Sequence, residues 1–234
     1  YLKNPKRLLK INCAEYSGNH EYAKLIGSPP GYIGSNEKSI LREKADESSQ
    51  WVILFDEIEK ASDKLHNLLL GFLDDGFVMD NHGITLDFTD SIFVFTTNIG
   101  IHEHVGKKII GFDAEITSYD GARELVKDAF KQEFSPEFIN RIDEIVYFNQ
   151  LSTEDVEKIT TLNLKKLPIK ITKRLVRHVV DNAYSIEYGA REVTRFIKQD
   201  ITLKLADKIL EGCASKIYKP VFKNKILSVE GVDG

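Results

Sequence analysis

Apolar runs separated by polar segments predict alternating strands and helices in the first part of the chain. Four short, mainly apolar runs have the length of buried strands; they cover residues 8–13, 51–55, 91–97 and 145–148, and the third is rich in β-branched and aromatic residues. Ser62 can cap a helix with an apolar face over residues 65–73 that stops near Gly76, and a second helix is expected over residues 120–133. Strands that alternate with helices predict an α/β fold with a mostly parallel sheet covered on both faces.

The pattern changes near residues 149–152, where a smaller and mainly helical domain is expected to begin. Residues 152–155 (STED) resemble a capping box that opens a helix. Apolar residues then recur every fourth position over residues 193–209, as in a long amphipathic helix, and residues 221–229 can add a short hairpin. We therefore predict two domains, a large one over residues 1–150 and a small one over residues 151–234.

Composition and charge narrow the function classes. The 234 residues are 42% hydrophobic and 29% charged, as in an ordinary globular protein, and no apolar run approaches the roughly 20 residues of a membrane helix. Residues 151–234 carry 16 Lys+Arg against 11 Asp+Glu, whereas residues 1–150 carry 16 against 25. An acidic larger part argues against nucleic-acid binding. The two cysteines, Cys13 and Cys213, lie far apart in sequence, which favours a reducing, cytoplasmic setting.

Candidate chemistry begins where the second apolar run, residues 51–55, meets Asp56 and Glu57. Adjacent carboxylates at a strand end often serve nucleotide hydrolysis, one holding Mg²⁺ and the other orienting a water. Asn98 follows the third run, so the three polar side chains are expected at one edge of the sheet. The alternative is that both acids are solvated residues at a strand end.

A phosphate-binding loop should accompany such acids, but its motif is absent. The loop has the form G-x-x-x-x-G-K-[ST]. Gly71 and Gly76 have the glycine spacing but are followed by Phe77, and Gly106 and Gly111 are followed by Phe112. Neither pair has the lysine, so the phosphate loop does not occur in this sequence.

Six segments in order resemble the second ATPase module of the Clp-type AAA+ unfoldases, the group of ClpA, ClpB, ClpC and ClpE. The segments are KLIGSPPGYIGSNE, WVILFDEIEKA, FLDDG, FTTNIG, FSPEFINRIDEIVYF and YGAREVTR. The resemblance spans nearly the whole chain and implies an AAA+ parallel sheet, with its amino-terminal part missing, followed by a small helical domain. In that family the phosphate loop lies just upstream of the position of Tyr1. We therefore expect a fragment that is inactive alone, and the alternative is a naturally degenerate ATPase.

The resemblance assigns roles in ATP hydrolysis with Mg²⁺. Asp56 resembles the acid that binds Mg²⁺, Glu57 the acid that polarises water, and Asn98 the polar sensor of the γ-phosphate. Arg141 resembles an arginine finger that acts on the ATP of a neighbouring subunit. The alternatives are a helix N-cap for Asn98 and a salt bridge to Asp143 or Glu144 for Arg141.

Two positions of the small domain belong to the same set. Arg191 resembles a second sensor that contacts the γ-phosphate and couples hydrolysis to domain rotation. Ile159 is expected to line the adenine pocket. The alternatives are a surface arginine and an ordinary core isoleucine.

Two further segments resemble contact sites for other proteins. The segment Gly31-Tyr32-Ile33-Gly34 resembles the pore loop that drags a polypeptide through a hexameric ring, and residues 80–85 resemble a second pore loop. The tripeptide Ile110-Gly111-Phe112 resembles the motif that docks on the ClpP peptidase. The alternatives are a buried turn tyrosine and a loop that folds back on its own domain.

The sequence thus predicts the ATPase module of a homo-hexameric unfoldase that threads unfolded or tagged proteins, into ClpP. One rival function is a ClpB-like disaggregase that works without a peptidase. Another is a catalytically silent scaffold. A replication-type AAA+ protein fits poorly, because the larger part is acidic and Tyr32 lies in a pore-type motif.

Overall fold

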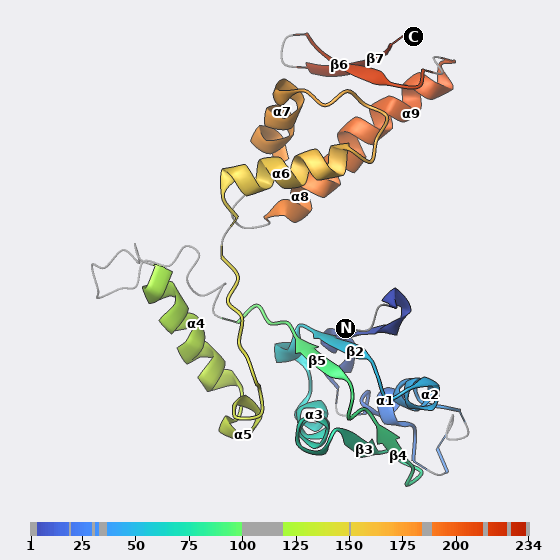
Figure 1. Cartoon of the computed structure of the whole chain (residues 1–234), viewed down its shortest axis with the longest axis vertical. Helices are drawn as coiled ribbons and strands as arrows, with labels where there is room; N and C mark the ends of the chain where they lie inside the picture. The colour runs from blue at the N-terminus through green and yellow to red at the C-terminus, as the bar shows by residue number, and fades with distance from the viewer. Residues whose placement is uncertain are drawn as a thin grey trace. The chain divides into compact units, whose positions relative to one another are not determined.

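The computed structural model in Figure 1 describes most of the chain, in nine segments. They are residues 4–18, 20–29, 31–32, 37–99, 119–149, 151–183, 189–212, 215–223 and 226–232. The chain forms two compact units, Tyr1–Tyr147 and Phe148–Gly234, which are described separately below.

The first unit is built on a three-stranded parallel sheet in the order β1-β2-β5. The strands are β1 (Leu8–Asn12), β2 (Val52–Asp56) and β5 (Ile92–Phe95). In the register of β2, Asp56 pairs with Asn12 of β1 and Phe55 pairs with Phe95 of β5. The predicted parallel sheet is therefore confirmed, and the carboxyl ends of its strands meet at one edge.

Helices and a β-hairpin complete the first unit. The helical segments are η1 (Pro5–Arg7), η2 (Cys13–Tyr16), α1 (Ala23–Ile26), α2 (Ile40–Glu47), η3 (Ile58–Lys60), α3 (Asp63–Asp75), α4 (Tyr119–Glu133) and α5 (Pro136–Ile139). The hairpin pairs β3 (Phe77–Met79) with β4 (Thr85–Asp87) in antiparallel fashion. Helix α3 lies beside β5 and leads into this hairpin (Figure 1).

Helix α3 follows the predicted amphipathic pattern. Leu65, Leu69 and Phe72 are buried, and Phe72 packs against Phe93 of β5 with ring centroids 5.5 Å apart. Gly76 ends the helix in a left-handed conformation with φ 74°. Ser62 occupies the predicted N-cap position, but its side chain makes no capping hydrogen bond.

An aromatic cluster fixes the segment after α4 on the sheet. Phe138 of α5 lies 5.5 Å from Phe95 of β5 and 5.4 Å from Phe134, measured between ring centroids. All three rings belong to the hydrophobic core of the first unit, together with Phe55, which stacks on Phe95 at 5.5 Å. Aromatic pairs in this range add stability beyond simple burial.

The fourth predicted strand is wrong. Residues 145–148 form no strand in the structure. Phe148 is 93% exposed and Val146 is 65% exposed, so the apolar side chains that suggested a buried strand face solvent. An apolar run indicates a strand only when a neighbouring strand satisfies its backbone groups, and none pairs with these residues.

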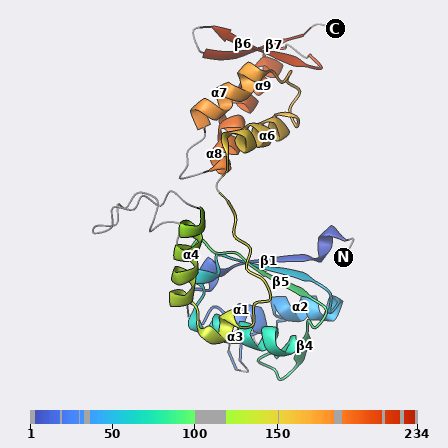
Figure 2. The ribbon, with the colours of Figure 1, turned by 60° about the vertical axis from the view of Figure 1, so that its left-hand side comes forward.

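The second unit is a helical bundle with a hairpin (Figure 2). Its elements are α6 (Thr153–Leu164), α7 (Lys173–Ala183), α8 (Ala190–Phe196), the π-helical segment η4 (Ile197–Thr202), α9 (Leu203–Leu210), β6 (Tyr218–Lys223) and β7 (Ile226–Gly231). The capping box at Ser152 and Asp155 is confirmed, and so is the hairpin. The long helix predicted over residues 193–209 is also confirmed, with η4 inserted in it. No helix among the described residues is long and apolar enough to cross a membrane.

Candidate active site

Asp56 lies at the carboxyl edge of the sheet, held from both neighbouring strands. Its carboxylate accepts a hydrogen bond from the Thr96 hydroxyl at 2.5 Å, just after β5, and pairs with the Lys10 ammonium of β1 at 2.6 Å. The side chain remains 33% exposed. Because charge-assisted bonds of this kind fix orientation, the carboxylate is held at the edge while still open to solvent.

Glu57 is held in a strained backbone conformation. With φ 59° and ψ 54°, it is the one non-glycine residue with positive φ among the described residues. Its N–H donates to the Thr96 hydroxyl at 3.1 Å, and the Ile58 N–H donates to the Thr96 carbonyl at 3.0 Å. A left-handed non-glycine residue costs about 1–3 kcal/mol and persists only where its surroundings hold it, as is common at active sites.

The edge carries a negative field. Burial, followed by the charges of Glu59, Asp56 and Glu57, raises the pKa of the Cys13 thiol to about 12. This thiol therefore stays protonated at neutral pH and is a poor nucleophile. The same field favours a cation at the edge.

The donor set fits a magnesium ion that is bound chiefly through a nucleotide. No three His, Cys, Asp or Glu side chains of the described segments are grouped as ligands that could hold a metal by themselves. Mg²⁺ is usually held by one or two carboxylates, water and substrate phosphates. The half-exposed carboxylate of Asp56 supplies a hard oxygen ligand of this kind.

Asn98 shares this edge of the first unit. Its N–H donates to the Glu59 carboxylate at 3.4 Å, while its side chain is exposed. Its alternative interpretation as an N-cap depends on residues after Ile99, which lie outside the described residues. The structure therefore brings Asp56, Glu57 and Asn98 to one edge, as the strand pattern predicts.

Arg141 makes different contacts from those considered from sequence. Its Nε donates to Asp74 at the end of α3, its Nη1 donates to the Glu137 carbonyl at 3.0 Å, and its Nη2 lies 3.3 Å from the Glu137 carboxylate. The salt bridge to Asp143 or Glu144 is absent among these contacts. The segment itself is anchored by the Phe138 ring on β5.

The remaining nucleotide-related positions lie in the second unit. Arg191 is exposed in the first turn of α8, directly after Gly189 and Ala190. Gly189 has φ 59°, a conformation that suits glycine. Ile159 is half-buried on α6.

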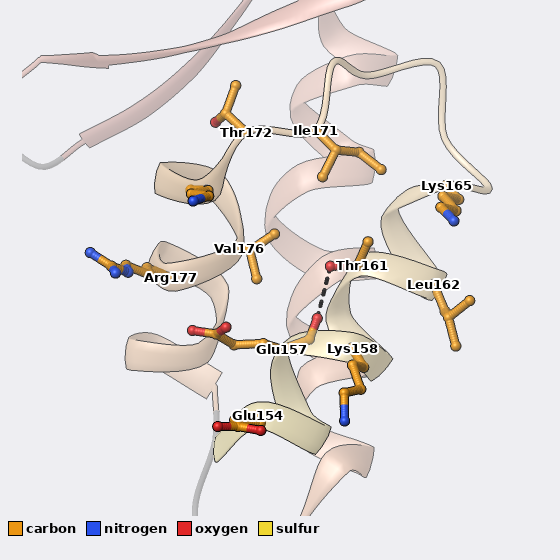
Figure 3. A pocket seen from close by; sticks show the side chains of 11 residues that line it. Glu154, Glu157, Lys158, Thr161, Leu162, Lys165, Ile171, Thr172, Val176 and Arg177 are labelled. Carbon is orange, nitrogen blue, oxygen red and sulfur yellow. Dashed lines mark hydrogen bonds between the residues drawn. The ribbon is translucent and has the colours of Figure 1, made fainter. Parts of the chain in front are cut away.

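The second unit also contains an open groove between α6 and α7 (Figure 3). Its volume is about 860 Å³, and its lining is Glu154, Glu157, Lys158, Thr161, Leu162, Lys165, Ile171, Thr172, Lys173, Val176 and Arg177. Neither Ile159 nor Arg191 is part of this lining. The labelled cations Lys158, Lys165 and Arg177 point in different directions (Figure 3), so they do not converge on one anion.

The first predicted substrate loop is partly described. Tyr32 is 71% exposed and follows Gly31, which has φ 92°. The buried-turn alternative for this tyrosine is therefore wrong. Ile33 and Gly34 lie outside the described residues, and so does the whole tripeptide Ile110-Gly111-Phe112.

The second predicted loop, residues 80–85, is bonded to the base of the first. The buried Asp80 carboxylate accepts from the N–H groups of His82 and Ile84, both at 2.8 Å. Asn81 donates from its backbone to the Ile26 carbonyl at 3.1 Å and from its side-chain amide to the Gly27 carbonyl. The two loops are thus joined at their bases.

Sequence reasoning missed Lys10, Thr96, Asp74 and Asn81. Thr96 had a usable signal, because parallel pairing of residues 51–55 with residues 91–97 places a hydroxyl beside the acids. Asp74 and Asn81 had no such signal, since the residues that they contact, Arg141 and Gly27, are 67 and 54 residues away in the sequence.

Comparison with known proteins identifies the family. Residues 1–145 match the model of the AAA domain (Cdc48 subfamily), and residues 150–219 match the C-terminal D2-small domain of ClpB protein. The chaperone protein ClpC1 of Oryza sativa chloroplasts is 36% identical over 226 residues, covering 91% of this chain and 25% of that protein. The ATP-binding subunit ClpC of Staphylococcus epidermidis is 33% identical, covering 88% of this chain and 26% of that protein. The chain thus spans about a quarter of the length of the curated relatives it matches.

Solved structures give the same result. The closed-state reconstruction of Hsp104 with ATPγS and FITC casein superposes with a TM-score of 0.81 at 30% identity, covering 98% of this chain and 40% of that one. The Saccharomyces cerevisiae Hsp104–casein complex in its extended conformation has the same TM-score and identity, covering 97% of this chain and 41% of that one. The chain therefore belongs to the Clp-type AAA+ ATPase family.

Proposed function

We propose that this chain is the ATP-hydrolysing module of a protein unfoldase that works as a ring of six copies. The observation that carries the proposal is the strained Glu57 beside Asp56, both fastened by Thr96 at the carboxyl edge of the sheet. Strain and a directed pair of acids at such an edge are typical of a hydrolytic site. The family membership of both parts of the chain supports the same function.

Each residue of the edge has a distinct role in the proposal. Asp56 holds Mg²⁺, which supplies neutralising charge for the phosphate oxygens when it is bound. Glu57 orients a water and accepts its proton at the carboxylate, and Asn98 positions that water through its amide. Lys10 and Thr96 keep Asp56 in place.

Three residues complete the nucleotide site in the assembled protein. Arg141 reaches the ATP of a neighbouring copy, where its cationic side chain stabilises developing phosphate charge. Arg191 contacts the γ-phosphate, and Ile159 lines the adenine pocket. This chain alone does not turn over ATP, because its sequence has no G-x-x-x-x-G-K-[ST] loop to hold the phosphates.

Tyr32 grips the substrate in this proposal. An exposed aromatic side chain offers apolar contact to any extended polypeptide without reading its sequence. The bonds from Asn81 to the base of this loop connect it with residues 80–85, which contact the same polypeptide. The similar Hsp104 structures contain casein, which supports a polypeptide as substrate.

The catalytic role of Glu57 predicts a separation of binding from turnover. In the assembled parent protein, Glu57→Gln should retain ATP binding and lower turnover by roughly 10²–10⁴-fold, since the amide keeps the shape but cannot accept the proton. Steady-state hydrolysis and an ATP titration measure the two quantities.

Glu47→Gln, on the exposed face of α2, is the matched control and should leave turnover unchanged. The 234-residue chain alone should show no turnover. Wild-type turnover in Glu57→Gln would reject the assignment.

The gripping role of Tyr32 predicts that substrate unfolding can be lost while ATP turnover is kept. Tyr32→Ala should abolish unfolding of a tagged substrate and leave ATP turnover unchanged, because it removes apolar grip and leaves Asp56 and Glu57 intact. Tyr32→Phe should keep unfolding, since the hydroxyl is not needed for apolar contact. Undiminished unfolding by Tyr32→Ala would contradict the grip.

We propose ClpP peptidase as the partner, docked by Ile110-Gly111-Phe112. Two apolar side chains, each worth about 1.5–3 kcal/mol when buried, would act repeatedly around a ring. Replacing Ile110 and Phe112 by Ser should abolish co-sedimentation with ClpP and spare ATP turnover, whereas the control Ile109→Ser should change neither. An unchanged ClpP complex would favour the ClpB-like disaggregase instead.

A further inference from the structure

The Arg141 side chain is held at its inner end by an acid of another element. Asp74, in the last turn of α3, accepts a hydrogen bond from Nε, and Glu137 takes the Nη1 bond through its carbonyl and pairs with Nη2 through its carboxylate. The hydrogen bond to Asp74, followed by the charges of Asp74 and Glu137, raises the pKa of Arg141. The side chain is 26% exposed, so it is restrained without being buried.

These contacts leave the outer end of the guanidinium available. The group has five N–H donors, and Asp74 and Glu137 use one on each of the three nitrogens. One N–H on Nη1 and one on Nη2 have no partner among the described residues. Two terminal donors in a fixed plane suit the oxygens of a phosphate group.

Asp74 is itself fixed by the packing of α3. Leu69 and Phe72, which precede Asp74 in the helix, are buried, and Gly76 ends the helix with its N–H bonded to the Phe72 carbonyl at 3.0 Å. A Cβ at Gly76 would lie 2.8 Å from Thr89, so the chain approaches too closely there for any side chain. The carboxylate therefore stands on a rigid helix end.

The same helix touches the candidate active site through His66. The His66 Nε2 lies 3.0 Å from the Ile58 carbonyl, so Nε2 carries the proton and donates. The imidazole also contacts Phe134 and Phe138, with centroids 5.6 and 6.0 Å away. Through His66, helix α3 thus contacts Ile58, the residue after Glu57, and the rings of Phe134 and Phe138. Through Asp74, it also contacts Arg141.

We propose that Asp74 is a positioning residue, which holds Arg141 in the orientation that acts on the ATP of a neighbouring copy. The inference rests on the proposed function, since it requires Arg141 to act between copies. It adds that, within one copy, α3 connects the carboxyl edge of the sheet, through His66, to Arg141. That arginine then acts on the ATP of the next copy. Asp74 itself touches neither nucleotide nor metal in this scheme.

Asp74→Asn in the assembled parent tests the inference, with Asp75→Asn as its matched control. Asp75 is the next residue, is exposed, and makes no ion pair with a described residue. Asp74→Asn should lower the kcat of ATP hydrolysis by roughly 10–100-fold without changing ATP affinity, because a misplaced group costs rate rather than binding. Asp75→Asn should leave kcat unchanged, although it removes the same charge.

A mixing experiment separates action between copies from a structural effect. Asp74→Asn subunits retain Glu57, and Glu57→Gln subunits retain Asp74. Rings mixed from the two should therefore hydrolyse ATP faster than the sum of the two pure rings. No gain at any ratio would overturn the inference. If Asp74→Asn fails to assemble, Asp74→Glu keeps the charge and should give an intermediate kcat, whereas a wild-type kcat would overturn the inference.

Arg141→Ala distinguishes failure of the inference from failure of the proposed function. An inactive Arg141→Ala with a fully active Asp74→Asn would reject the role of Asp74 alone. Full turnover by Arg141→Ala would reject the role of Arg141 and the inference with it. Equal thermal melting of Asp74→Asn and Asp75→Asn should accompany the predicted difference in kcat.

Discussion

The bonds of Thr96 to the end of β2 are the contact on which the rest of the candidate site depends. Its hydroxyl bonds Asp56 and the Glu57 N–H, its carbonyl takes the Ile58 N–H, and its own N–H bonds the Phe55 carbonyl at 2.9 Å. Together these bonds compensate the cost of the left-handed Glu57. They also fix the turn by which the chain leaves β2 toward α3.

This arrangement connects local geometry to action at a distance. Helix α3 begins soon after the acids and ends at the partner of Arg141, so one rigid element links two proposed catalytic positions. A 13-residue helix is about 20 Å long, so the two ends of α3 serve separate places in the unit. The bonds of Asn81 to Ile26 and Gly27 join the two substrate-loop candidates in a comparable way.

Local pattern predicted the elements that pack locally. The strands at residues 8–13, 51–55 and 91–97 are predictable because each has alternate side chains that enter the core, as Ile53 and Phe55 do. Residues 145–148 have the same apolar character but no neighbouring strand, and sequence gives no direct sign of that absence. The capping box at Ser152 was found because all of its atoms lie within four residues.

The residue types of the candidate site were predictable, but their partners were not. The two acids and Asn98 could be placed at one edge because parallel strands end together. Proximity in sequence suggests Asp143 and Glu144 as partners of Arg141, whereas the structure provides Asp74 through tertiary packing. The strained conformation of Glu57 is likewise invisible in a residue name, since it is held by bonds to Thr96, just after β5.

The central claim is that the end of β2 is where ATP is hydrolysed in the assembled parent. A high-resolution structure of that parent with Mg²⁺ and a slowly hydrolysed ATP analogue tests it most directly. The account predicts the metal bound to the Asp56 carboxylate, directly or through one water, and a water within about 2.6–3.2 Å of the Glu57 carboxylate, facing the γ-phosphate. A bound nucleotide with its metal and terminal phosphate remote from both acids would contradict the account.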